Sequence, residues 1–166
     1  MTERRPIERD GLRAGLIAAG AVALFYAGFD QLAARGPLYT VNLLGLALFR
    51  GVRDPAIRQL PIAIDTGAIL TYTVLHLALS VVIGVIVTRF LGIARREPGK
   101  APMIWLLLVA GGVATILAIG YATGPLRVLL PWWSIVVANA LAVAVVGADL
   151  LRRHPDVGGI GRDRAG

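Results

Sequence analysis

The chain has 166 residues, of which 57% are hydrophobic and only 16% are charged. A typical soluble domain is about 45–50% apolar and about 25% charged, so this composition is typical of a membrane protein. Cysteine is absent, which excludes disulfides and cysteine nucleophiles. The formal charge is +7, but the basic residues are divided among short segments with no continuous basic face, so we expect no nucleic-acid partner.

Four long uncharged stretches divide the chain. They hold 16 residues between Arg13 and Asp30, 23 between Asp65 and Arg89, 26 between Lys100 and Arg127, and 21 between Arg127 and Asp149. A helix needs roughly 20 apolar residues to cross a bilayer. The stretches lack the polar stripe of a soluble amphipathic helix and the alternation of a barrel strand. The sequence therefore predicts transmembrane helices at about 12–33, 67–91, 103–123 and 129–151.

One long connection, residues 34–66, follows the first predicted span. Gly36-Pro37 indicates a turn, and Thr40 is suited to cap a helix. The apolar run that follows predicts a short helix at about 41–51, which is too short to span the bilayer. We expect a short interfacial helix in this outer loop, with a re-entrant helix as the alternative. Two placements stay open, an outer lid across the mouth of the bundle and an amphipathic segment at the level of the headgroups.

The fold class predicted is all-α integral membrane, with four transmembrane helices in an up-down-up-down bundle, because short connections make successive helices antiparallel. Twelve basic residues fall on the side of both chain ends and five on the other. The positive-inside rule then places both ends in the cytoplasm of a bacterial inner (plasma) membrane. Residues 1–11 form a cytoplasmic segment, and the glycine-rich tail 154–166 is expected to be disordered.

Small residues recur at four-residue spacing along the predicted spans, as is typical of transmembrane helices that approach closely. The candidate packing residues are Gly11, Gly15, Ala19 and Ala23 in the first span, Gly84 in the second, Ala114 and Ala118 in the third, and Ala138 and Ala142 in the fourth. These faces either pack the helices of one chain together or dock onto other membrane subunits or a second copy of the protein.

Polar side chains at membrane depth are costly and indicate candidate sites. The candidates for an outward-facing polar pocket are His76, Asn139, Asp30, Tyr72 and Tyr121. Histidine titrates near neutrality, so His76 is suited to bind a ligand, relay protons or sense pH. The alternative is that His76 and Asn139 hydrogen-bond with each other or with backbone carbonyls and fix the helix register.

Motifs of enzymatic chemistry are missing. The sequence has no phosphate loop, no His-Glu-x-x-His motif and no Gly-x-Ser-x-Gly elbow, so we expect neither a catalytic nor a metal site, and no enzyme. A haem held by two histidines of one chain is also not expected, because His76 and His154 are predicted on opposite sides of the membrane. We expect no cofactor.

Four pieces of the sequence together resemble a known kind of protein. They are Gly11-Leu12-Arg13-Ala14-Gly15, the run from Gly36-Pro37-Leu38-Tyr39-Thr40 to Leu44-Gly45-Leu46-Ala47-Leu48-Phe49, His76, and Leu129-Leu130-Pro131-Trp132-Trp133. In this respect the chain resembles small four-helix bacterial inner-membrane proteins, over residues 11–153. The resemblance implies the four-helix architecture. That family has no known activity, so the resemblance implies no chemistry.

Two hypotheses about function follow. The first is a non-enzymatic accessory or scaffolding subunit of a larger membrane complex, such as a respiratory or photosynthetic one. It would bury a small-residue face against a partner. The alternative is a small-molecule binder, sensor or carrier that uses the outward-facing pocket around His76.

Overall fold

The computed structural model describes residues 4–51, 62–126 and 129–153, and in these ranges it contains helices and turns but no strand. The helices are α1 (Arg4–Leu32), α2 (Tyr39–Phe49), α3 (Thr66–Arg96), α4 (Ala101–Ala122) and α5 (Trp132–Arg153), with 3-10 turns η2 (Pro98–Lys100) and η3 (Gly124–Leu126). Four helices are long and apolar enough to cross a membrane. They are Glu8–Leu32, Thr66–Arg96, Pro98–Tyr121 and Trp132–Arg153. The predicted fold class is confirmed.

Four helices begin earlier than predicted, α3 by one residue and α4 by two, and the largest difference is in α1. α1 starts at Arg4 rather than near residue 12, so the helix continues through most of the charged segment 1–11. Charged side chains are no obstacle to a helix that has left the hydrocarbon, because arginine and glutamate are good helix formers. α2 starts at Tyr39, two residues before the predicted start.

One long helix begins later than predicted. α5 starts at Trp132 rather than at residue 129, because the chain first turns around Leu126. The Leu129 and Leu130 N–H groups donate to the Leu126 carbonyl at 2.9 and 2.8 Å. The predicted tail 154–166 lies outside the described residues.

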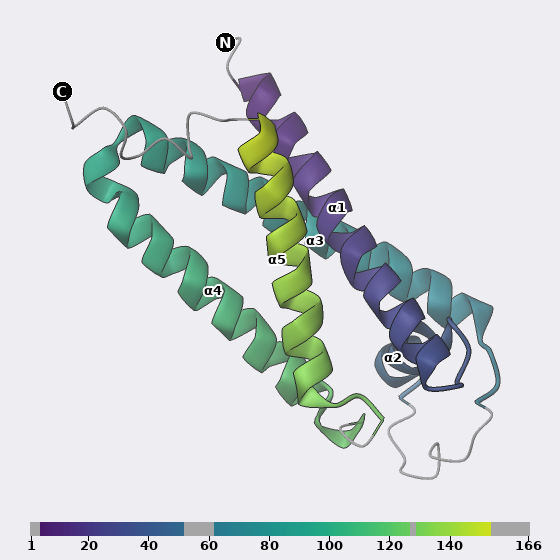
Figure 1. Ribbon diagram of the computed structural model, residues 1–166. Coiled ribbons are helices and arrows are strands. Elements are labelled where there is room, and N and C mark those ends of the chain that lie inside the picture. Colours follow the sequence, from purple (N-terminus) through teal and green to yellow (C-terminus); the bar gives the residue numbers. More distant parts are fainter. Residues whose placement is uncertain (1–3, 52–61, 127–128, 154–166) are drawn as a thin grey trace.

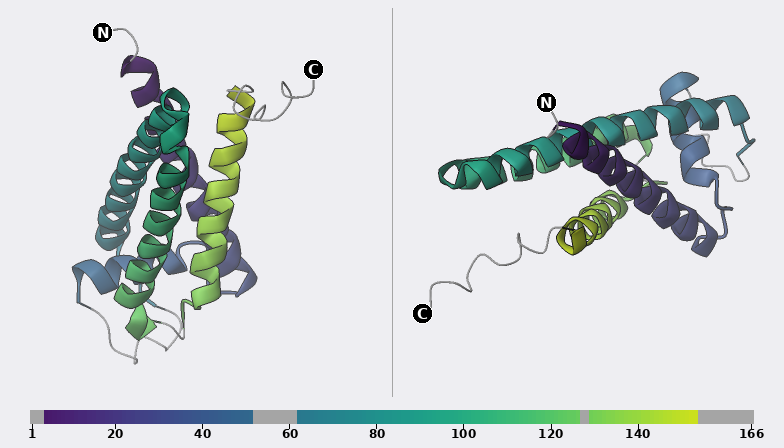
Figure 2. Two further views of the ribbon diagram at one scale, coloured as in Figure 1. Left: turned by 90° about the vertical axis from the view of Figure 1, so that its left-hand side faces the viewer. Right: turned by 90° about the horizontal axis from the view of Figure 1, so that it is seen from above.

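The long helices alternate in direction, so the start of α1 and the end of α5 lie at the same end of the bundle (Figures 1 and 2). α1 lies between α3 and α5 and makes most of the contacts between long helices. α4 makes few contacts with α3 or α5 and meets each of them mainly at one end (Figure 1). The bundle therefore consists of three closely packed helices and a fourth that stands apart.

The closest contact joins α1 to α3 through glycine. Gly11, Gly15 and Gly84 are all buried. A Cβ atom built on Gly15 would lie 2.5 Å from the Ser80 carbonyl oxygen, and one built on Gly84 would lie 2.5 Å from the Gly15 nitrogen. The two backbones therefore touch at positions where any side chain would separate them. Lipid tails are as apolar as leucine, so contact of this kind holds helices together in a bilayer.

Charged side chains connect the same three helices where α1 begins. Arg13 of α1 donates to both carboxylate oxygens of Asp149 of α5, at 2.8 and 3.0 Å. Further pairs are Arg153–Asp149 at 3.5 Å, Arg153–Asp10 at 3.9 Å and Arg89–Glu8 at 3.6 Å. Exposed ion pairs each contribute only about 0.2–1 kcal/mol, so this network fixes the register of the helices more than it stabilises them.

At the opposite end, α2 lies across the bundle (Figure 2). Tyr39 and Leu43 of α2 form a buried apolar cluster with Leu126 of the connection between α4 and α5. Gly45 of α2 lies on α3, where an added Cβ atom would be 2.5 Å from the Ala68 carbonyl oxygen. Of the two placements that the sequence left open, this contact favours a helix packed across the end of the bundle.

We expect Gly84→Ala to lower the free energy of unfolding by about 1–3 kcal/mol, because the new methyl group meets the backbone of α1 and has no flexible neighbour to displace. Unfolding of the detergent-solubilised protein, followed by circular dichroism, measures the effect. Gly111→Ala in α4 is the matched control, since no atom lies within 4 Å of its added Cβ. Equal stability of the two variants would contradict the proposed role of the contact.

Candidate functional site

Two of the candidate pocket residues lie together on α3. Tyr72 and His76 are one helical turn apart, and their rings are nearly parallel (5°) with centroids 6.0 Å apart. The imidazole lies against the backbone of Ala19 on α1, whose small side chain is buried. His76 Nε2 is buried and has no hydrogen-bond partner among the described residues. Buried polar atoms ordinarily have a partner, so either a small rotation of the ring lets the imidazole donate to the Ala19 carbonyl, which would fix the register of α1 and α3, or the nitrogen contacts a ligand.

A pair of hydroxyl groups extends this region to α5. Ser134 is fully buried and donates to the Pro131 carbonyl at 2.7 Å. The Ser134 oxygen is 3.4 Å from Tyr26 Oη. Because the one hydroxyl proton of Ser134 is given to Pro131, Tyr26 is the donor in this pair. Tyr26 lies on α1, which packs against α3.

Tyr26, Tyr72, His76 and Ser134 together form what we call the polar cluster, to which α1, α3 and α5 all contribute. Tyr26 and Ser134 were not among the pocket residues expected from the sequence. Both residues lie in the outer half of the predicted spans, as the other candidates do. This shared depth was the one sequence signal that could have identified them. Which face of its helix each residue occupies relative to the neighbouring helices could be read only from the structure.

Asp30, a third candidate pocket residue, caps α2. The side chain is fully buried, and its two oxygens accept hydrogen bonds from the Thr40 N–H and the Thr40 hydroxyl, both at 2.7 Å. A carboxylate at a helix N-terminus satisfies a free N–H group and interacts favourably with the helix dipole. The sequence suggested Thr40 as the capping residue, whereas the structure places Thr40 inside α2 and gives the cap to Asp30.

The other two candidates lie apart from His76. Asn139 donates to the Ile135 carbonyl of its own helix at 2.7 Å, and in the part of the chain that the structure describes no hydrogen bond joins it to His76. Tyr121 is 85% exposed. The structure thus brings together Tyr72 and His76 from the predicted pocket, and uses Asp30 and Asn139 in contacts of other kinds.

The connection from α2 to α3 ends in a set of polar contacts outside the spans. Arg50 donates to Asp65 at 2.9 Å, and Asp65 also accepts from the Ala68 N–H at 2.9 Å, which caps α3. The hydrogen bonds from Arg50 and the backbone lower the pKa of Asp65 from its ordinary value. The Asn42 amide donates to the Ala63 carbonyl and accepts from the Asp65 N–H, each at 3.0 Å. These contacts hold α2 against the start of α3.

The predicted packing residues fall into two groups. The buried ones are Gly11, Gly15, Ala19, Gly84, Ala138 and Ala142. The exposed ones are Ala23, Ala114 and Ala118. The buried group belongs to the three closely packed helices, whereas two of the three exposed residues lie on α4.

An apolar groove of about 520 Å³ lies between α1 and α5. None of the five candidate pocket residues lines it. Among the described residues, no three His, Asp or Glu side chains gather in a way that could hold a metal ion.

Replacing Asp30 with alanine removes both acceptors at the start of α2, and we expect this to lower the stability by about 1–2 kcal/mol, as for the loss of other helix caps. Backbone amides of α2 should then exchange faster with deuterium, while those of α4 serve as an internal reference. Asp30→Asn keeps one acceptor and should give an intermediate rate. Unchanged exchange of α2 in both variants would show that the cap does not hold this helix.

The four spanning helices make this chain an integral membrane protein by length and hydropathy. No protein-family model, no curated protein and no solved structure matches the chain.

Proposed function

We propose that the protein is a non-enzymatic accessory or scaffolding subunit that docks onto another membrane protein through α4. The supporting observation is a row of small residues on this helix, Ala110, Ala114 and Ala118, which are all exposed. On the other helices, Gly11, Gly15 and Ala19 of α1, Gly84 of α3 and Ala138 and Ala142 of α5 are buried in the bundle, whereas a second row on α5, Ala140, Ala144 and Ala148, is exposed like that of α4. Because small residues allow helices to approach closely in lipid, the row on α4 is suited to receive a helix from a partner.

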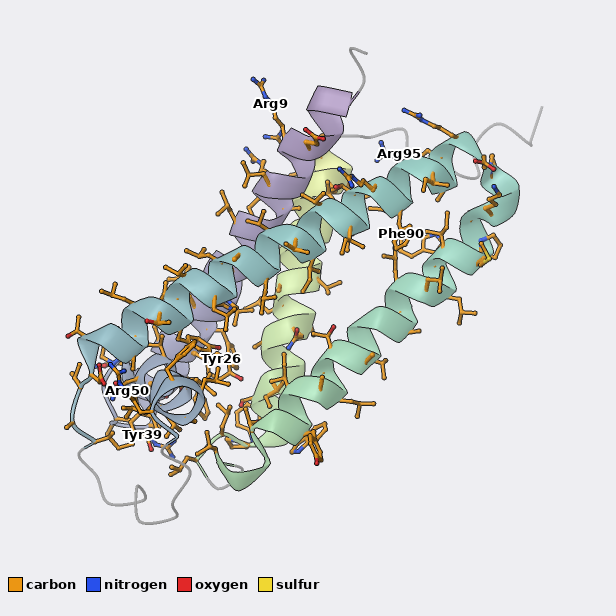
Figure 3. The ribbon with its side chains drawn as sticks, turned by 180° about the vertical axis from the view of Figure 1, so that it is seen from behind. Arg9, Tyr26, Tyr39, Arg50, Phe90 and Arg95 are labelled. Atoms are coloured by element: carbon orange, nitrogen blue, oxygen red, sulfur yellow. The ribbon has the colours of Figure 1, made fainter. Side chains whose placement is uncertain are left out.

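The way in which α4 is held supports this role. Near its start Ile104 is 3% exposed, and near its end Gly120 is buried beside the ring of Trp132. Between these two positions, large residues such as Leu106 and Val109 are 68% and 62% exposed. Phe90 of α3 lies between α3 and α4 near their connection (Figure 3). The middle of α4 is therefore open to lipid or to another helix.

The proposal includes an orientation in the membrane. Where α1 begins, the described residues include ten basic ones, Arg4, Arg5, Arg9, Arg13, Arg89, Arg95, Arg96, Lys100, Arg152 and Arg153, and four acidic ones, Glu8, Asp10, Glu97 and Asp149. At the opposite end they include two basic ones, Arg35 and Arg50, and two acidic ones, Asp30 and Asp65. Figure 3 shows Arg9 and Arg95 at one end and Arg50 at the other. This asymmetry supports cytoplasmic chain ends in a bacterial inner membrane.

Ala114→Leu should abolish co-purification of the partner from native membranes, because the larger side chain keeps a second helix from approaching α4. The mass of the mildly solubilised complex is the measurement, and the wild type should exceed the 17.5 kDa of one chain. Val113→Leu is the matched control, because Val113 is also exposed but lies about 100° around the helix.

Two results would contradict the docking proposal. One is a wild-type protein that purifies as a monomer with no companion. The other is an equal loss of the partner in the Ala114 and Val113 variants, since the effect would then not depend on the small-residue row.

A second candidate function is small-molecule binding at the polar cluster, and the unpartnered Nε2 atom of His76 favours it. A ligand that offers a hydrogen-bond donor or acceptor would satisfy this buried nitrogen. Its position beside Tyr72 would also let a planar ligand stack on the aromatic ring.

A ligand of this kind should raise the melting temperature of the wild type by several degrees and leave that of His76→Ala unchanged, because the substitution removes the contact atom. A thermal-shift screen of the purified protein provides the measurement. Asn139→Ala is the control, because the Asn139 amide is bonded to its own helix, and this variant should respond like the wild type. If His76→Ala only lowers the melting temperature and every ligand response persists, His76 has a structural role.

A further inference from the structure

We propose that the groove between α1 and α5 binds one acyl chain of an anionic phospholipid, with the phosphate at the arginines beside Arg13. The residues that line the groove include Ile17, Gly20, Leu24 and Phe25 of α1, and Leu141 and Val145 of α5. This site is separate from the row of small residues on α4, and it does not depend on the function proposed above.

The floor of the groove exists because Gly20 has no side chain. No atom lies within 4 Å of the position where its Cβ would be. Ile17, Leu24 and Leu141 supply apolar walls around this space. An open apolar groove on the surface of a membrane helix pair is in contact with lipid tails, so a hydrocarbon chain is its natural occupant.

The groove begins at a charged group. Arg13 lies one helical turn before Ile17 on α1, and Asp149 lies one turn after Val145 on α5. The lining residues of both helices therefore lead to the Arg13–Asp149 ion pair. At the other end Phe25 stacks on Phe29 with centroids 6.2 Å apart, and Phe29 contacts the ring of Trp133 at 5.5 Å. These aromatic rings close the groove.

The length of the groove suits one leaflet of a bilayer. On α1 the lining residues run from Ile17 to Phe25, which is eight residue steps or about 12 Å at 1.5 Å per residue. Arg13 lies four steps before Ile17, so the distance along the helix from Arg13 to Phe25 is about 18 Å. The hydrocarbon core of a bilayer is about 30 Å thick, so each leaflet contributes about 15 Å. A groove of this length therefore accommodates an acyl chain of one leaflet whose headgroup lies near Arg13.

The charge at the mouth of the groove favours an anionic headgroup. Four arginines stand there, Arg9, Arg13, Arg152 and Arg153, against the two carboxylates of Asp10 and Asp149. Asp149 is already bonded to Arg13 and lies 3.5 Å from Arg153. Arg9 and Arg152 are exposed, and Arg9 extends away from the ribbon (Figure 3). Guanidinium groups bind phosphate through charge-assisted hydrogen bonds, so a phosphate at the mouth would meet a net positive charge.

Native mass spectrometry of the full-length protein tests the site, with palmitoyl-oleoyl phosphatidylglycerol and phosphatidylcholine of the same chains as probes. The wild type should retain one phosphatidylglycerol, several-fold more strongly than phosphatidylcholine. Gly20→Leu should lower this retention at least tenfold, because the leucine side chain fills the groove. Its helix content should not change, because the new side chain enters open space.

Gly28→Leu is the matched control. Gly28 lies on the same helix, also has no atom within 4 Å of its Cβ position, and is not among the lining residues, so this variant should keep the lipid. The double variant Arg9→Gln with Arg152→Gln should bind phosphatidylglycerol no better than phosphatidylcholine.

Three outcomes would overturn the proposal. The first is equal retention of the two lipids by the wild type, and the second is undiminished retention by Gly20→Leu. The third is a wild-type dimer that Gly20→Leu dissociates, because the groove would then be a contact between two copies of the chain.

Discussion

Contact between the backbones of α1 and α3 is the constraint on which the rest of the structure depends. Gly11, Gly15 and Gly84 have no side chains to separate the two helices, and dispersion between closely packed atoms replaces the hydrophobic effect that lipid cannot supply. One turn beyond Gly15 along α1, the same crossing places the His76 ring against Ala19. The position of His76 therefore depends on a contact made mainly by backbone atoms.

The membrane-spanning part of the chain tolerates a buried acid at the end of α1 because both of its oxygens have partners. Asp30 accepts two hydrogen bonds from Thr40, so the donors at the start of α2 stabilise its negative charge. α2 in turn joins the start of α3 to the connection between α4 and α5. One end of the bundle is thus held by a short helix and its cap, and the other end by ion pairs in contact with water and headgroups.

The number and the positions of the spans could be predicted from the sequence, because long uncharged runs have few alternatives in a bilayer. The contacts between distant residues could not. Arg13 and Asp149 are 136 positions apart, and nothing in their local sequence shows that α1 lies beside α5. His76 and Asn139 were grouped because they have similar depth, but depth does not fix the rotation of a helix about its axis. The rows of small residues on α1 and α4 look alike in the sequence, although Gly11, Gly15 and Ala19 of the first are buried and Ala110, Ala114 and Ala118 of the second are exposed.

The crossing of α1 and α3 also bears on the order of assembly during biosynthesis. Both of its partners are present once the ribosome has made residues up to Arg96, before α4 and α5 exist. The pair that packs most closely can therefore form in the bilayer while translation continues. α5 then packs against two helices that are already in contact, and α4 is tethered between α3 and α5.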